Sequence, residues 1–196
     1  MNLYDELPRG VTVDGRFYAL DFDFRNVLRM MNTLARDDLI PDARDYLALK
    51  CLTKRPRNVQ KVLNAVKGIL FEPVATTGER VTSFEQDAGL IRAAFRQTYG
   101  IDLWRARLHW LEFIELCHNL PEGNRYTEIV SIRSRPMPPA TKYNSAEREW
   151  LQKAKAQCAL HLTEAEAARK YDKDVGNLFA GLMGMIKKDV KNDNGE

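Results

Sequence analysis

Residues capable of acid, base or nucleophilic chemistry are few in this chain, and their spacing gives them no common site. Cys117 and His118 are adjacent, but neighbouring side chains on a helix point about 100° apart and cannot form a local nucleophile and base couple. No second Cys or His stands at metal-ligand spacing from this pair. Glu112 and Glu115 lie one turn apart on the same predicted helix, where carboxylates are ordinarily solvated. We expect neither a catalytic couple nor a metal site here.

Two histidines and a set of glycines lead to the same expectation. Neither His109 nor His161 has a carboxylate partner that the sequence identifies. Gly176, Gly181 and Gly184 are too widely spread for a phosphate-binding loop, lie in a helical context, and lack a following Lys-Ser/Thr pair. The sequence therefore predicts a protein that is not an enzyme and that binds no cofactor.

Composition bounds the size of the core and the classes of partner. With 196 residues, of which 44% are hydrophobic, the chain can build one sizeable core with a small appendage. Its 30 Lys and Arg against 27 Asp and Glu give a net charge of +3, which is too small to indicate electrostatic capture of nucleic acid. Residues 1–6 lack a signal-peptide pattern, and no stretch approaches the ~20 apolar residues of a membrane span. We expect a soluble, unexported protein without a membrane partner.

The cysteines indicate the redox compartment. Cys51, Cys117 and Cys158 are odd in number, widely spaced and set in helical patterns, which argues against a disulfide framework and for a reducing compartment. We interpret them as small core or surface residues.

The first predicted element is a β-hairpin within residues 11–20. Asp14-Gly15 separates the short segments 11–13 and 16–20, and an Asp-Gly pair favours a two-residue turn because both positions need positive φ. Asp23 is then placed to cap a helix. Its apolar positions follow helical spacing: Phe24, Val27, Leu28, Met31 and Leu34. From there the sequence is predicted to be almost entirely helical.

Two short helices with a basic elbow between them follow. Pro41 suits the first turn of a helix through residues 42–52, and a break at residues 55–58 precedes a helix with inward positions from Val59 to Leu70. Basic residues gather around the elbow: Lys50, Lys54, Arg55, Arg57 and Lys61. A helix-turn-helix would place phosphate contacts there, so a nucleic-acid-binding module is an alternative function. The missing tight glycine turn and the balanced total charge argue against it.

The middle of the chain contains one long loop and a well-marked helix. Residues 72–82 lack periodicity and are predicted as the loop. Ser83 and Gln86 stand at capping-box spacing and open a helix that includes Phe84 and ends at Tyr99-Gly100, where glycine can adopt the left-handed conformation.

Residues 103–120 are predicted to form the most apolar helix, capped by Asp102. Its apolar residues cover a broad surface: Leu103, Trp104, Leu108, Trp110, Leu111, Phe113, Ile114 and Cys117. A helix this apolar is buried on more than one side. It is either the central helix of the domain or a docking surface for another chain, and in the second case Trp110 and Phe113 are the partner-binding candidates.

After a break at Pro121, a short helix over residues 126–132, a proline-rich connector over 135–139 and a helix from Asn144 or Ser145 are predicted. One face of the last helix carries Trp150, Leu151, Ala154 and Cys158. Arg133, with Arg135 and Arg125 nearby, could hold an acidic partner or a phosphate, although a solvated face or internal salt bridges explain the same residues.

The final segment is a weakly helical, apolar extension. Thr163 and Glu166 mark another capping box, and residues 174–190 combine apolar residues with glycines that each cost about 1 kcal/mol of helix stability. Four apolar residues are the partner-binding candidates: Phe179, Leu182, Met183 and Ile186. Packing on its own domain, self-association or client binding, and disorder all remain open for this segment.

The predicted fold is therefore mainly α. Residues 1–160 form a small helical domain with an N-terminal β-hairpin, and residues 161–196 form a C-terminal helical extension or tail.

An ordered set of short motifs resembles the Gp-fifteen-type family of bacteriophage proteins over roughly residues 3–160. The specificity lies in their order, since each motif alone is weak. The motifs are Asp5-Glu6-Leu7-Pro8, residues 13–18 of the hairpin, Asp23-Phe24-Arg25, residues 84–87, residues 99–103, residues 110–113, Leu120-Pro121-Glu122, Ile132-Arg133-Ser134 and Glu149-Trp150-Leu151.

This resemblance implies a phage tail assembly chaperone. Such proteins are encoded between the major tail protein and the tape measure of long-tailed phages and prophages. The role implies binding to the tape measure protein in the host cytoplasm, contact with the major tail tube protein, self-association into oligomers, and absence from the mature virion. A structural tail-completion or connector component of the virion is the third alternative, beside the chaperone and the nucleic-acid-binding module.

Overall fold

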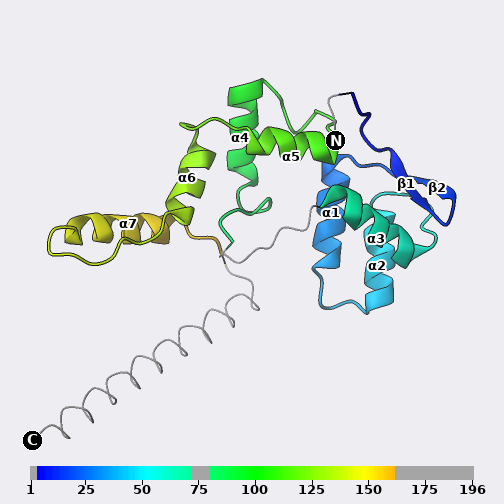
Figure 1. Cartoon of the computed structure of the whole chain (residues 1–196), viewed down its shortest axis with the longest axis horizontal. Helices are drawn as coiled ribbons and strands as arrows, with labels where there is room; N and C mark the ends of the chain where they lie inside the picture. The colour runs from blue at the N-terminus through cyan, green and yellow to red at the C-terminus, as the bar shows by residue number, and fades with distance from the viewer. Residues whose placement is uncertain (1–3, 72–79, 162–196) are drawn as a thin grey trace, which may run out of the picture. The chain divides into compact units, whose positions relative to one another are not determined.

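The computed structural model describes residues 4–71 and 80–161 (Figure 1). This part of the chain is mainly α with an N-terminal antiparallel hairpin, which confirms the predicted fold class. Its elements are β1 (Gly10–Val13), β2 (Arg16–Ala19), α1 (Phe24–Leu34), α2 (Pro41–Lys50), α3 (Val59–Leu70), α4 (Ala88–Tyr99), α5 (Trp110–His118), α6 (Arg125–Ser134) and α7 (Ser145–Cys158). All of them belong to a compact unit, Met1–Cys158, and a second unit comprises Ala159–Glu196. Apart from residue 161, the predicted extension (161–196) lies outside the described residues.

The hairpin forms as the sequence predicts. Val13 pairs with Arg16 across a two-residue turn, in which Asp14 has φ 50° and Gly15 has φ 73°. At the other end of β1, Gly10 lies so close to the Tyr18 carbonyl that an added Cβ would clash with the backbone. The hairpin is attached to α3 by an ion pair between Lys61 Nζ and Asp14 Oδ2 at 2.7 Å. Val11 and Val13 of β1 are also buried in the core, so the hairpin has the support that an isolated two-stranded ribbon lacks.

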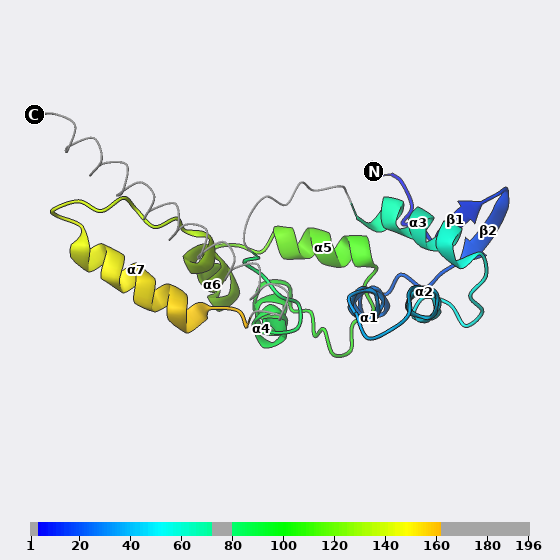
Figure 2. The same ribbon diagram turned by 90° about the horizontal axis from the view of Figure 1, so that it is seen from below.

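Helices α1, α2 and α3 follow the predicted order and caps. The Asp23 carboxylate accepts a hydrogen bond from the Arg25 backbone N–H at the start of α1, and Pro41 occupies the first turn of α2. Helices α1 and α2 lie side by side (Figures 1 and 2). Each contributes buried residues to the common core, among them Val27 and Met30 from α1 and Leu49 from α2.

The predicted helix over residues 103–120 is wrong in its first seven residues, because only Trp110–His118 is helical. Asp102 closes a single turn, and the chain then runs extended beside residues 22–24. The backbone N–H of Phe24 donates to the Leu108 carbonyl at 3.0 Å, and that of Trp110 donates to the Phe22 carbonyl at 2.8 Å. These hydrogen bonds use the backbone groups of Leu108 and Trp110, so residues 103–109 do not extend the helix.

Trp104 departs from the prediction together with that helix. Its side chain is 68% exposed, and the Arg92 guanidinium lies over its ring at 4.4 Å from the centroid. The ring therefore does not widen a buried helical face.

The capping box at Ser83 forms in part, but the helix begins later than predicted. Ser83 Oγ accepts a hydrogen bond from the Gln86 backbone N–H at 3.2 Å. The Ser83 backbone N–H donates to Asp87 Oδ2 at 2.9 Å. Turns occupy residues 84–87, and α4 starts at Ala88. Gly100 ends this helix with φ 69°, as the sequence predicts.

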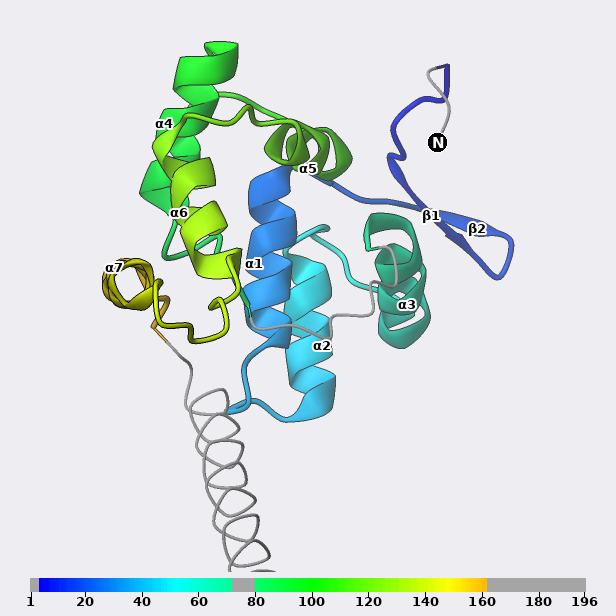
Figure 3. The same ribbon diagram turned by 60° about the vertical axis from the view of Figure 1, so that its left-hand side comes forward.

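Helices α6 and α7 pack against each other, with the proline-rich connector between them (Figure 3). Leu151 is buried, whereas Trp150 is 55% exposed, which corrects its predicted inward position. Because adjacent residues on a helix point about 100° apart, the narrow contact of α7 accommodates only one of these two side chains.

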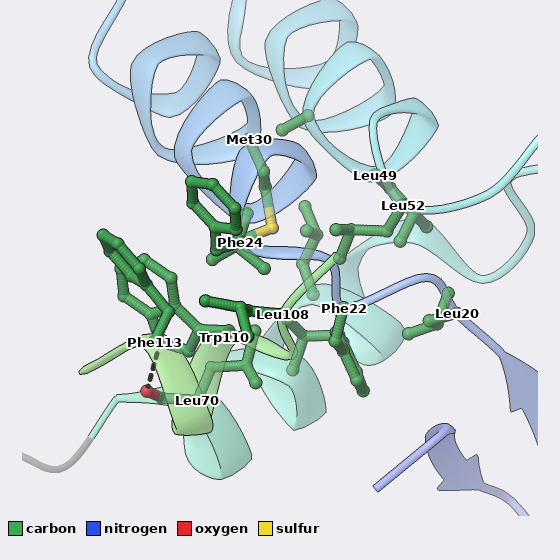
Figure 4. Packing of buried hydrophobic residues seen from close by; sticks show 14 of the residues in the cluster. Leu20, Phe22, Phe24, Met30, Leu49, Leu52, Leu70, Leu108, Trp110 and Phe113 are labelled. Atoms are coloured by element: carbon green, nitrogen blue, oxygen red, sulfur yellow. Dashed lines mark hydrogen bonds between the residues drawn. The ribbon is translucent and has the colours of Figure 1, made fainter. Parts of the chain in front are cut away.

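The core is centred on aromatic residues of α5 (Figure 4). The Phe113 ring centroid lies 4.6 Å from that of Phe24, 5.4 Å from that of Phe95 and 5.8 Å from that of Phe84. Trp110 packs beside it, and its indole Nε1–H donates to the Leu70 carbonyl at 3.1 Å (dashed line in Figure 4). The core thereby joins α1, α3, α4 and α5.

Candidate functional site

The two aromatic residues predicted as partner-binding candidates in α5 lie inside the core. Trp110 is 3% exposed and Phe113 is 2% exposed. A partner on the surface of this fold reaches neither ring, so the interpretation of these residues as the central helix of the domain applies. The candidates Phe179, Leu182, Met183 and Ile186 lie outside the described residues and stay predictions.

Arg133 is engaged inside the domain. Its guanidinium binds the Asp87 carboxylate in a bidentate pair, with Nη1–Oδ2 at 2.8 Å and Nη2–Oδ1 at 3.0 Å. Nη1 also donates to the Val81 carbonyl at 3.1 Å, and Nε donates to the Cys158 carbonyl at 2.5 Å. The side chains of Arg133 and Asp87 are 11% and 2% exposed. The internal salt bridge, which is one of the two sequence interpretations, therefore describes Arg133 better than a surface site for an acidic ligand.

The extended segment Leu20–Asp23 connects three parts of the fold and separates two hollows of the surface. The backbone N–H of Leu20 donates to the Arg9 carbonyl at 3.0 Å, and that of Asp21 donates to the Leu52 carbonyl at 2.9 Å. Both hollows include Leu20 and Asp21. The first is further lined by Pro8, Arg9, Phe22, Asp23, Arg107, Leu108 and His109. The second is further lined by Ala19, Leu52, Thr53, Lys54 and Arg55.

The titratable groups of the first hollow are committed to structure. His109 Nδ1 accepts from the Leu111 backbone N–H at 3.2 Å, so Nε2 carries the proton and donates to the Pro8 carbonyl at 3.0 Å. Burial holds the pKa of His109 below its ordinary value. The Asp23 carboxylate is bound by Arg25, with Nε–Oδ1 at 3.0 Å. This arrangement caps α5 and α1 rather than forming an acid and base pair.

His109 makes the stability of the fold pH-dependent. The folded state lowers the pKa of this ring, so the unfolded chain binds more protons below its own pKa of about 6.5. The contribution to the free energy of unfolding is therefore complete above about pH 6.5 and is lost as the pH falls toward the folded-state pKa. We expect His109→Asn, which keeps a capping side chain, to flatten the fall of the unfolding free energy between about pH 7 and pH 5.

Urea unfolding of wild type and variant across this pH range measures the effect. His118→Asn is the matched control, because His118 is exposed at the end of the same helix, and we expect it to retain the wild-type slope. An unchanged slope in His109→Asn would contradict the assigned role.

The Cys117-His118 pair gives no nucleophile in this structure. Burial raises the pKa of the Cys117 thiol to about 12, so the thiol stays protonated at neutral pH. Across residues 4–71 and 80–161, no group of three or more His, Cys, Asp or Glu side chains is placed to hold a metal ion. None of the helices in those ranges is long and apolar enough to cross a membrane.

The second hollow lies beside the basic elbow, which we define as Lys50, Lys54, Arg55 and Arg57. Within the part of the chain that the structure describes, none of these four exposed side chains has an ion-pair partner. Lys61, by contrast, is paired with Asp14. The apolar residues that line the hollow are Ala19, which is exposed, and Leu20 and Leu52, which are buried beneath it. Unpaired cations around an apolar lining suit a partner that carries carboxylates next to an apolar side chain.

Comparison with known proteins places this chain in a family. A protein-family model described as Bacteriophage Gp15 protein matches the chain over residues 3–160. The chain belongs to this bacteriophage family. The match confirms the resemblance carried by the ordered motifs, and it includes every helix and strand described above. No curated protein and no solved structure matches the chain.

In this Gp15-family protein, Ile40 is an exposed apolar residue that the sequence analysis missed. It is 72% exposed and immediately precedes Pro41 at the start of α2. Acidic residues on both sides, Asp37-Asp38 and Asp42, are the signal that could have identified it, since a run of carboxylates is rarely buried. The basic elbow, in contrast, was visible from the sequence.

Proposed function

We propose that this Gp15-family protein is a phage tail assembly chaperone that binds the tape measure protein and keeps it soluble and competent for assembly while the tail tube forms. The observation that carries the proposal is the family match over residues 3–160. In this role the protein acts without catalysis or a cofactor. His109, Asp23 and Arg133 make structural contacts within the domain.

The mode of action that we propose is multivalent coating. The tape measure protein is long and rich in helices, so many copies of a small protein can each cover a short apolar segment. Each contact must be weak enough to be displaced when tube subunits assemble. Exposed apolar side chains such as Trp104 and Trp150 offer contacts of this kind, and the candidates of the extension would add to them.

This role includes self-association into oligomers, contact with the major tail tube protein, action in the host cytoplasm and absence from the mature virion. Co-expression of the full chain with the tape measure protein of the same phage or prophage tests it. We expect the tape measure protein to be soluble, and to co-purify with the chain, only when the two are co-expressed. Unchanged solubility without a complex would contradict the chaperone function.

Phe179→Asp tests the extension in the same assay. We expect the substitution to reduce the amount of co-purified tape measure protein, because a carboxylate cannot be buried against an apolar client without a large desolvation cost. Tyr143→Asp is the control, since Tyr143 is exposed in the connector before α7. Equal recovery with both variants would remove Phe179 from the binding surface.

Nucleic-acid binding is the second candidate, favoured by the four unpaired cations of the basic elbow. It predicts a gel shift that weakens steeply as salt rises, because phosphate contacts release counterions. A structural role in the virion predicts the protein in purified particles. Neither result is expected for a chaperone that leaves the finished tail.

A further inference from the structure

We propose that copies of this chain associate head to tail, with the acidic loop before α2 of one copy seated on the basic elbow after α2 of the next. The acidic loop is residues 37–42, of which the last two form the start of α2, and the basic elbow is as defined above. The inference rests on the proposed function, which includes self-association, and it identifies the two surfaces that would meet. It can be tested without the tape measure protein.

The acidic loop presents an apolar side chain between carboxylates. Ile40 is its exposed large apolar residue, and the backbone of Ile40 is extended, with φ −63° and ψ 144°. Because Pro41 follows, this extended conformation is the one that Ile40 prefers. Asp38 is neutralised by Arg36, with Nη2–Oδ2 at 2.5 Å. Asp37 and Asp42 are exposed, and the described residues provide no ion pair for either. The loop thus offers a pre-formed apolar contact with two available negative charges.

The basic elbow offers the complementary features. Lys54 and Arg55 border the hollow, whose apolar lining is formed by exposed Ala19 together with Leu20 and Leu52. Asp21 also lines it, but Oδ2 of this carboxylate lies 3.4 Å from Arg107 and Oδ1 accepts from the Asp23 backbone N–H. An isoleucine side chain can enter such a hollow while its flanking carboxylates meet the cations on the border.

The acidic loop and the basic elbow of one copy are too far apart to touch each other, so a contact between them must join two copies. The two surfaces lie at opposite ends of α2 (Figure 3), and a ten-residue helix is about 15 Å long. The loop of one copy therefore cannot reach its own elbow. A contact between two different surfaces is heterologous, so each pair of copies leaves one free loop and one free elbow, and the assembly can grow.

Protein rather than nucleic acid is the occupant that these features favour. A phosphate backbone would use the cations of the elbow, but it would leave the apolar lining of the hollow without a partner. The acidic loop of a second copy satisfies both. Exposed charge pairs are individually weak, so the assembly should depend on concentration and weaken at high salt. Such an assembly can dissociate, as the proposed chaperone must when tube subunits displace it from the tape measure protein.

Sedimentation of the full chain over a range of concentrations, at low and high salt, tests the inference. We expect the average mass to rise with concentration and to fall with salt. Asp37→Lys with Asp42→Lys reverses the loop, and Lys54→Glu with Arg55→Glu reverses the elbow. Each double variant alone should associate at least tenfold more weakly than the wild type, since like charges then face each other.

Mixing the two double variants gives the decisive result. In the mixture, a reversed loop meets a reversed elbow and a native loop meets a native elbow, so association should return. A variant that had merely failed to fold could not restore it. Ile40→Ser should also weaken association, whereas Ile69→Ser on α3, a matched exposed isoleucine, should not.

Four outcomes overturn the inference: a wild type that remains monomeric, reversals without effect, a mixture that does not associate, or association that disappears after nuclease treatment. Failure here is distinct from failure of the chaperone function. A monomer that still keeps the tape measure protein soluble rejects only the head-to-tail contact. Restored association in the mixture, without any effect on the tape measure protein, rejects only the chaperone function.

Discussion

Phe113→Ala is expected to lower the free energy of unfolding by about 3–5 kcal/mol, the range for removing a buried phenylalanine. The Phe113 ring has four aromatic neighbours with centroids within 6.0 Å, and it stacks on two of them, Phe24 and Phe95. Truncation would remove contacts with three other parts of the core at once, and rigid ring neighbours cannot collapse into the space. Urea unfolding at neutral pH measures the loss.

Two further variants separate a core role from a binding role. Tyr143→Ala, at an exposed position, should change the unfolding free energy by no more than about 0.5 kcal/mol. Phe113→Leu keeps an apolar side chain in the core, so it should recover much of the stability and leave recovery of the tape measure protein unchanged. A Phe113→Ala variant of wild-type stability that loses the tape measure protein would instead place this ring on a binding surface.

The elements that the sequence predicted correctly are those specified by neighbouring residues. The Asp14-Gly15 turn, the Asp23 cap, Pro41 at the start of α2 and Gly100 at the end of α4 all act within a few residues of themselves. Such signals need no knowledge of the rest of the fold. Because these signals act only over a few residues, they carry no information about contacts between distant parts of the chain.

The error at residues 103–109 shows that limit. Apolar residues continue through this segment at spacings that fit a helix, so periodicity alone extends α5 backwards. The deciding contact is the pairing of Leu108 and Trp110 with residues 22–24, more than 80 positions away along the chain. Nothing in the local pattern reveals it, and a tertiary contact overrides the local preference.

The candidate site was predictable only in part. The cations of the basic elbow stand together in the sequence and lie together on the surface. The hollow beside them was not predictable, because Leu20 follows β2 and Leu52 follows α2, and the Asp21–Leu52 hydrogen bond brings these two segments together. Periodicity also could not decide whether Trp110 faces the core or a partner, since burial within a domain and burial in an interface require the same residue types.

Arg133→Met is expected to lower the free energy of unfolding by about 3–5 kcal/mol, because it leaves a buried carboxylate without its counter-charge. Asp87 is 2% exposed, and Arg133 supplies two of its hydrogen bonds. The same guanidinium donates to the Val81 and Cys158 carbonyls, so the substitution also releases the segment before α4 and the end of α7. Urea unfolding measures the loss, and hydrogen exchange should show faster exchange in α7.

A double-mutant cycle separates the ion pair from the packing around it. Asp87→Leu together with Arg133→Met removes both charges, so its cost should be smaller than the sum of the two single costs. Arg135→Met is the matched control. Its partner Glu147 lies at 3.4 Å on the exposed surface, where loss of a pair should cost no more than about 1 kcal/mol. If Arg133 bound an acidic partner instead, Arg133→Met would keep wild-type stability and lose only that partner. Because Arg133 makes a bidentate contact with a buried carboxylate, we instead expect Arg133→Met to lower stability strongly.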